Sequence, residues 1–182
     1  MQLILISGST RQASTNTAVL RSVQQMAPTG TVLELYTELA ALPAFDPDAD
    51  RDPLPEAVDR LRKAVASADG VLFCTPEYAG ALPGSVKNLL DWLVGDVVLT
   101  DMPVAWINVS SVAAPTGGAG AHGELRTVLG YVQAGIVEEA CRRVPMARTD
   151  VNDGVVTSPS LLAEFEQALR ALSAAARRSA GE

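Results

Sequence analysis

The sequence contains few histidine and cysteine residues, and each shortage excludes a class of function. His122 is the only histidine, so a site built from several histidines is excluded and a Ser-His-Asp triad has little to draw on. Cys74 and Cys141 form no Cys-x-x-Cys pair, so no redox dithiol or metal cluster is indicated. We expect both cysteines to be small apolar residues in strands. We expect His122, beside Gly123, to be a solvated loop residue.

Basic residues are also few. The chain has 14 Lys and Arg against 21 Asp and Glu, a formal net charge of −7. Binding to nucleic acid in general needs a basic face that displaces counterions, so we expect no such partner. No apolar run approaches the ~20 residues of a membrane span, and the N-terminus shows no signal-peptide pattern. We therefore expect a cytoplasmic protein with no membrane partner and no metal.

Short apolar, β-branched runs alternate with helical patterns along the 182 residues. Strands are expected at residues 2–7, 31–36, 70–75, 103–109 and, more weakly, 142–146. Helices are expected at residues 15–26, 55–68, 83–94, 121–135 and 159–178. This alternation predicts an α/β fold: a flavodoxin-like, doubly wound, five-stranded parallel sheet of order 2-1-3-4-5 with helices on both faces. We expect residues 1–178 to form a single domain and residues 179–182 a frayed tail.

The first motif, residues 8–16, connects the first expected strand to the first expected helix. The first amides of a helix lack intrahelical acceptors and the helix dipole favours negative charge there, so this turn suits a phosphate. Side chains that would add donors to this site are Ser9, Arg11, Ser14, Thr15 and Asn16. The motif is neither a Walker loop nor the three-glycine dinucleotide fingerprint. The alternative is an ordinary turn capped by Ser14.

The second motif follows the third expected strand, next to the first motif in the predicted sheet. Its loop, residues 76–84, contains two prolines that stiffen it, while Gly80 and Gly84 are free to take positive φ. Such a loop can present backbone N–H groups and the ring of Tyr78 to a flat ligand. A third segment, residues 110–123, is rich in Gly and Ala and permits close backbone approach.

Together, the first two motifs resemble those of the NADPH-dependent FMN reductase family. The residues that carry the resemblance are Gly8, Ser9, Arg11, Ser14 and Asn16 in the first motif, and Pro76, Glu77, Tyr78, Gly80, Pro83, Gly84, Lys87, Asn88, Asp91, Trp92 and Leu93 in the second. The similarity extends over about residues 1–131 and includes Leu42-Pro43-x-Phe45-Asp46. It implies a flavodoxin-like enzyme that binds FMN noncovalently. Such an enzyme passes hydride from NADPH or NADH, through flavin N5, to a flavin, quinone, azo or metal-oxyanion acceptor.

The resemblance also implies a cofactor site. Its phosphate would be held by Ser9, Arg11, Ser14, Thr15 and Asn16. Its ring would be lined by Pro76, Glu77, Tyr78, Ala79 and Gly80, and closed on the other flank by the loop from Ser110 to Gly118, including Gly117. Ala79 stands where the family commonly has Asn, which removes a polar side chain near the flavin rim. No catalytic side chain is expected, because the flavin carries the chemistry.

Several alternatives stay open at this point. The chain could be a flavodoxin-type electron carrier without nicotinamide-linked activity, or a flavin-free module that has kept the fold. The family tends to form dimers or tetramers, and residues 83–94 together with the loop before them are our candidate interface for a homodimer or homotetramer. Lys87 and Asp91 could form a simple i,i+4 ion pair, while Leu89 and Trp92 are expected in the core. The choice between NADPH and NADH is open.

Overall fold

The computed structural model describes residues 1–11 and 13–181. Its strands are β1 (Gln2–Ser7), β2 (Val32–Tyr36), β3 (Gly70–Thr75), β4 (Pro103–Ser110), β5 (Gly135–Ile136), β6 (Arg142–Pro145), β7 (Val151–Asn152) and β8 (Val155–Val156). Its α-helices are α1 (Thr15–Gln25), α2 (Glu56–Ala66), α3 (Gly84–Val94), α4 (Ala119–Tyr131) and α5 (Pro159–Ser179). Short 3-10 turns cover Leu39–Ala41, Pro47–Ala49, Glu138–Ala140 and Arg148–Asp150.

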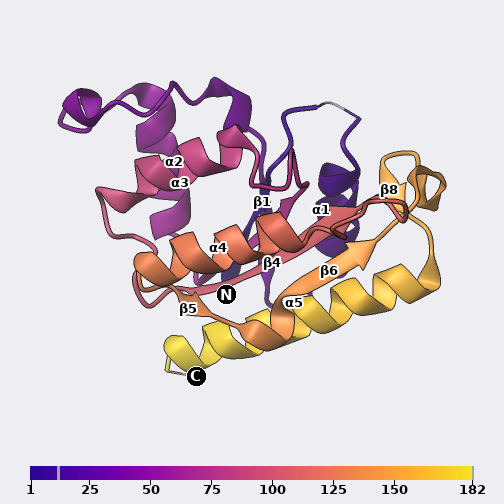
Figure 1. Cartoon of the computed structure of the whole chain (residues 1–182). Coiled ribbons are helices and arrows are strands. Elements are labelled where there is room, and N and C mark those ends of the chain that lie inside the picture. Colours follow the sequence, from indigo (N-terminus) through magenta and orange to yellow (C-terminus); the bar gives the residue numbers. More distant parts are fainter. Residues whose placement is uncertain (12, 182) are drawn as a thin grey trace.

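The main sheet is parallel and has the order β2-β1-β3-β4-β5, with β6 also paired to β4 (Figure 1). The register places Ile6 beside Phe73 and Phe73 beside Trp106. Strands β3 and β4 are buried along their whole length, as expected of a parallel sheet covered on both faces. The predicted flavodoxin-like fold class is confirmed.

Alternate residues of each central strand belong to the two cores, one on each side of the sheet. Helices α2, α3 and α4 cover the face that carries Ile4, Phe73 and Trp106, and α1 and α5 cover the opposite face (Figure 1). Leu89 and Trp92 of α3 are fully buried, so their predicted core positions are confirmed. None of the helices in the described residues combines the length and the apolar character needed to cross a membrane.

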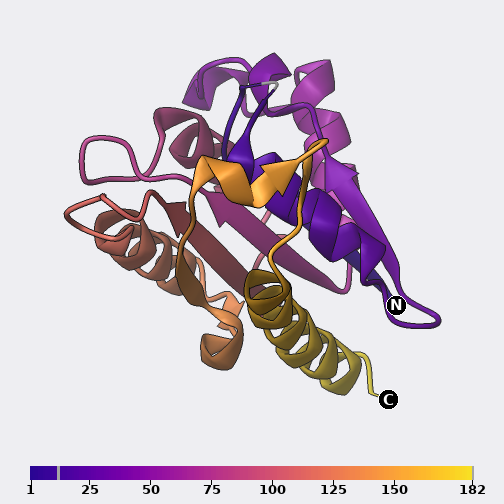
Figure 2. The same cartoon turned by 90° about the vertical axis from the view of Figure 1, so that its right-hand side faces the viewer.

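The C-terminal third departs from the prediction in detail. The two-residue strand β5 and the hairpin of β7 and β8 were not predicted, because strands this short carry no periodicity. The hairpin packs on α1 (Figure 2), where the backbone N–H of Val156 donates to Ser22 Oγ over 2.8 Å. Helix α5 continues to Ser179 and residue 182 lies outside the described residues, so the single domain and the frayed tail stay predictions.

Residues 43–50 are fastened to α2 and α3. The Asn88 side chain accepts from the Phe45 N–H over 2.7 Å and donates to the Pro43 carbonyl over 2.8 Å. Arg62 forms a largely buried ion pair with Asp50 at 2.7 Å. Lys87 and Asp91 form the predicted i,i+4 ion pair on the outer side of α3. Lys87, Asn88 and Asp91 of α3 are therefore engaged within the chain.

Candidate functional site

A cavity of about 530 Å³ lies beyond the carboxyl ends of β1, β3, β4 and β6. Ligands of open α/β sheets bind at this edge, where the strand order reverses. Eight of the predicted site residues line the cavity: Ser9, Arg11, Ser14, Thr15, Asn16, Pro76, Tyr78 and Ser110. The structure thus brings together residues that the sequence places in three separate segments.

One end of the cavity is the N-terminus of α1. Ser14 is the N-cap of α1, and its hydroxyl accepts a hydrogen bond from the Thr17 N–H over 3.3 Å. The backbone N–H groups before Thr17 lie in the first turn of the helix and have no intrahelical acceptor. The Asn16 amide oxygen accepts from the Cys74 thiol at 3.5 Å, which leaves its NH₂ group for the cavity. Gly8 lets this turn approach β3, since a Cβ there would lie 2.6 Å from Thr75 Cβ. This end of the cavity presents N–H donors and the Arg11 charge.

The loop after β3 forms a tight hairpin. Tyr78 and Ala81 exchange backbone hydrogen bonds of 3.0 Å in both directions, and the central residues Ala79 and Gly80 have φ of 52° and 78°. Positive φ at both central positions is the geometry of a type I′ turn, which favours Asn-Gly. The positive φ expected at Gly80 is confirmed, whereas Gly84 is the first residue of α3. The Tyr78 side chain is 52% exposed at the cavity.

This turn gives a physical reason for the Asn that the family commonly has at position 79. We expect Ala79→Asn to raise the free energy of unfolding by about 0.5–1 kcal/mol, because Asn tolerates left-handed backbone better than Ala. Ala79→Val should lower it, because a β-branched residue is strained at positive φ. Urea unfolding of both variants checks this, and a destabilising Asn at position 79 would contradict the explanation.

Four predicted site residues do not line the cavity: Glu77, Ala79, Gly80 and Gly117. The Glu77 carboxylate turns instead to the N-terminus of α4, where it accepts from the N–H groups of Gly120 (2.7 Å) and Ala121 (3.2 Å) and from the Thr116 hydroxyl. The Thr116 hydrogen bond, followed by those of the two amides, lowers the pKa of Glu77. The Glu77 side chain thus ties the second motif to α4, and direct cofactor contacts of these four residues stay predictions.

Sequence reasoning missed four residues that line the cavity: Val109, Met146, Ala147 and Arg148. Ser111 and Val112 belong to the loop from Ser110 to Gly118, which was expected to close one flank of the ring. Arg148 could have been found, because it follows the strand expected at residues 142–146 and so belongs to the same sheet edge. The others are apolar or small and carry no signal of their own.

The expectation for His122 was wrong. His122 lies in the first turn of α4, half-buried, and its Nδ1 accepts a 2.8 Å hydrogen bond from Trp106 Nε1. Nδ1 of His122 also lies 3.1 Å from Asn108 Oδ1, so the imidazole is held between the side chains of Trp106 and Asn108. Burial, followed by the charges of Arg126 and Arg143, lowers the pKa of His122 from 6.5. Of the cysteines, Cys74 lies in β3 as expected, whereas the half-buried Cys141 precedes β6.

The lowered pKa of His122 predicts a loss of stability in mild acid. Below pH 6.5 the unfolded chain binds a proton at this imidazole that the folded chain resists, so the free energy of unfolding should fall as pH falls through 6.5. We expect His122→Gln to flatten the pH dependence of Tm between about pH 7 and 5. NMR titration of the single imidazole gives its pKa directly, and a value above 6.5 in the folded protein would refute the prediction.

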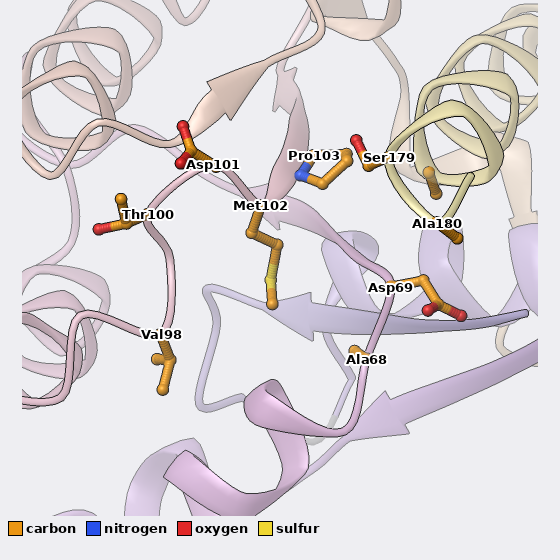
Figure 3. Close-up of a pocket in the computed structure, with 10 residues that line it drawn as sticks. Ala68, Asp69, Val98, Thr100, Asp101, Met102, Pro103, Ser179 and Ala180 are labelled. Carbon is orange, nitrogen blue, oxygen red and sulfur yellow. The ribbon is translucent and has the colours of Figure 1, made fainter.

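Figure 3 shows a different hollow, at the opposite edge of the sheet. It lies between the segment of residues 98–103, the start of β3 and the end of α5. Its charged groups are the carboxylates of Asp69 and Asp101, and Asp69 accepts a 2.7 Å hydrogen bond from the Gln2 N–H. No basic side chain of the described residues lines it. The hollow therefore lacks the features of a phosphate site.

The comparison with known families decides the classification. The sequence model of NADPH-dependent FMN reductase matches residues 1–148, which include both motifs. The chain belongs to the NADPH-dependent FMN reductase family. Membership confirms the predicted FMN-dependent oxidoreductase that uses NAD(P)H, and it gives no support to the electron-carrier alternative.

Relatives of this FMN reductase family member agree with the classification. A quinone reductase of Escherichia coli (strain K12) is 32% identical over 142 residues, which are 76% of this chain and 74% of the relative. A 2-hydroxy-1,4-benzoquinone reductase of Burkholderia sp is 30% identical and covers 86% of each chain. The structure of FerB, a flavoenzyme NAD(P)H:(acceptor) oxidoreductase from Paracoccus denitrificans, superposes with a TM-score of 0.80 at 27% identity, covering 97% of this chain and 95% of FerB.

Proposed function

We propose that the chain binds FMN in the 530 Å³ cavity and reduces a small quinone at the expense of NAD(P)H. The proposal rests on one observation. The cavity has an anion site at one end, and a buried hydroxyl that has no hydrogen-bond partner among the described residues also lines it. When bound, FMN accepts a hydride at N5 and passes the electrons on to the acceptor. The residues of the chain bind and orient this group.

The phosphate of FMN would lie at the N-terminus of α1. The free amides at the start of the helix and the helix dipole favour a dianion there, and the Arg11 guanidinium adds a permanent charge. The hydroxyls of Ser9 and Thr15 and the NH₂ group of Asn16 line the same end of the cavity. A phosphate is the cofactor group that matches this set of donors.

The ring of FMN would lie between the Tyr78 hairpin and the segment that follows β4. Ser110 supports this placement, because it is only 8% exposed and its Oγ has no hydrogen-bond partner among the described residues. A buried hydroxyl without a partner costs about 1–3 kcal/mol, which a polar atom of a ligand would recover. Val109 and Met146 supply apolar wall to the same cavity. A flat heterocycle with polar edges fits this combination.

The cavity contains no side chain suited to acid–base catalysis near neutral pH. Of the described residues that line it, only Arg11, Arg148 and Tyr78 can ionise. A histidine or a carboxylate, the side chains that most often act as general acid or base, is not among them. We infer that the chain positions the reactants and that the protons taken up by the reduced acceptor come from solvent.

The acceptor class is proposed from the relatives. The E. coli relative is named a quinone reductase and the Burkholderia relative a 2-hydroxy-1,4-benzoquinone reductase. A quinone is flat and can stack on the open side of a flavin after the nicotinamide has left. Two substrates that use one face in turn imply ping-pong kinetics, with parallel double-reciprocal lines.

The experiment that tests the proposal is an absorption titration of the purified chain with FMN. It is followed by anaerobic addition of NADPH, then NADH, then 1,4-benzoquinone. We expect FMN to bind, its long-wavelength band to bleach with at least one nicotinamide, and quinone to restore the band. FMN binding without bleaching would contradict the proposed reductase activity. No FMN binding at all would refute the proposed cofactor site.

We further propose that the chain works in the cytoplasm as a homodimer or homotetramer. The large apolar side chains exposed on the described surface, such as Val97 and Tyr131, support association. Helix α3 itself is less suited to an interface than the sequence indicated, because its apolar residues other than Val94 are buried within the chain. Light scattering coupled to size exclusion checks the state, and a 19.0 kDa particle would refute it.

A further inference from the structure

A second cavity, of about 350 Å³, adjoins the proposed FMN cavity at its phosphate end. The two share Arg11, Ser14, Thr15 and Arg148 as lining residues. The remaining walls of the second cavity come from the turn before α1, from α1 and from the hairpin of β7 and β8: Ala13, Ala18, Arg21, Val151, Asp153 and Gly154. A ligand that reaches past the FMN phosphate would therefore enter this space.

The second cavity is bounded by two elements that are fastened together. The hydrogen bond from Val156 N–H to Ser22 Oγ is buried and holds β8 against α1. The hairpin turns at Gly154, whose φ is 78°, and Arg21 lies against it: Arg21 Nη1 is 3.0 Å from the position of a Cβ on Gly154. Arg21 of α1 and Arg148, in the 3-10 turn before the hairpin, thus line one space.

Within the part of the chain that the structure describes, the arginines of this cavity form no ion pair with a carboxylate. Ion pairs of 4.0 Å or less engage seven of the 14 basic side chains in the described residues: Arg60, Arg62, Lys63, Lys87, Arg126, Arg142 and Arg170. Three of the other seven, Arg11, Arg21 and Arg148, line this one cavity. In a chain of net charge −7, this local excess of positive charge favours an anion.

We propose that the second cavity binds the adenosine phosphate half of FAD, so that the chain accepts FAD as well as FMN. The proposal rests on the FMN site proposed above. In FAD the second phosphate is joined directly to the first, so a first phosphate at the start of α1 places the second within reach of this cavity. Arg21 and Arg148 are suited to bind it, because guanidinium groups form bidentate, charge-assisted hydrogen bonds with phosphate.

The other walls suit an adenosine. Ala13, Ala18 and Val151 offer apolar surface to a purine. Asp153 lines the same space, and a carboxylate is a good acceptor for the hydroxyls of a ribose, as in dinucleotide sites. The same carboxylate would repel a 2′-phosphate. The pocket therefore fits the free ribose of FAD better than the phosphorylated ribose of NADPH.

The test is isothermal titration of the flavin-free chain with FMN and with FAD. Arg21 is the residue to change, because it lines the second cavity and not the first. We expect Arg21→Gln to weaken FAD binding about tenfold and to change FMN binding less than about twofold. Arg51→Gln is the matched control: this exposed arginine also lacks an ion pair within the described residues but lies on the segment before α2. It should leave both affinities unchanged.

Three results would overturn the proposal. FMN binding without FAD binding would show that the second cavity does not accept the adenosine half, with the FMN site intact. Equal effects of Arg21→Gln on both flavins would show that this arginine acts on the shared phosphate only. A raised KM for NADPH alone, with unchanged FAD affinity, would assign the cavity to the nicotinamide donor. Absence of binding by either flavin would instead refute the FMN site itself.

Discussion

Replacing Arg11 by glutamine is expected to weaken FMN binding on the order of 30-fold, because the change removes a charge-assisted hydrogen bond to the cofactor phosphate. Arg11 lines the phosphate end of the cavity, is exposed, and has no ion-pair partner among the described residues. Its loss should therefore leave the stability of the flavin-free chain unchanged. Titration with FMN and urea unfolding of the same preparation separate the two effects.

Arg11→Lys refines this prediction. Lysine keeps the charge but loses the planar fork, so it should restore part of the affinity and leave a deficit against arginine. Riboflavin, which lacks the phosphate, should bind the original chain and Arg11→Gln alike. An equal loss of riboflavin and FMN affinity in Arg11→Gln would contradict a phosphate contact and would indicate that the turn of residues 8–16 had been disturbed.

The parts of the molecule that were predictable from the sequence are those with a strong local signal. Strands β1 and β3 have the predicted bounds, because a strand covered on both faces is an uninterrupted apolar run. Five site residues, Ser9, Arg11, Ser14, Thr15 and Asn16, were predictable because a strand that turns into a helix forms an anion site whatever the rest of the chain does. The other three, Pro76, Tyr78 and Ser110, followed from the family resemblance.

The parts that were missed depend on contacts between distant residues. The hairpin of β7 and β8 is held by Ser22, far away in the sequence, and its two-residue strands have no pattern. His122 was expected in a solvated loop because nothing near it in the sequence indicates Trp106, against which it packs. Likewise, Glu77 belongs to the second motif, yet its carboxylate is used by the amides of α4. Sequence patterns predict which side chains lie at the carboxyl-terminal edge of the sheet. They do not predict which residue each of these side chains contacts.

The contact between the second motif and α4 predicts opposite effects for the same substitution at two glycines of one helix. A Cβ on Gly120 would overlap the backbone carbonyl oxygen of Gly80 and lie 2.6 Å from its carbonyl carbon, whereas a Cβ on Gly123 would meet nothing within 4 Å. Gly120→Ala must therefore push the hairpin of residues 78–81 away from α4. Gly123→Ala only replaces an exposed helical glycine.

We expect Gly120→Ala to lower the free energy of unfolding by about 2 kcal/mol, because overpacking against backbone is not relieved by a side-chain rotation. The displacement also weakens the hydrogen bond of 2.7 Å that Glu77 accepts from Gly120 and moves Tyr78 at the cavity, so FMN affinity should fall as well. Gly123→Ala should raise the free energy of unfolding by about 0.5–1 kcal/mol through helix propensity and leave FMN affinity unchanged. Urea unfolding and FMN titration of the two variants provide the test. Equal stability changes would mean that α4 and the hairpin are not in close backbone contact, and a destabilised Gly120→Ala with full FMN affinity would mean that the hairpin does not position the flavin.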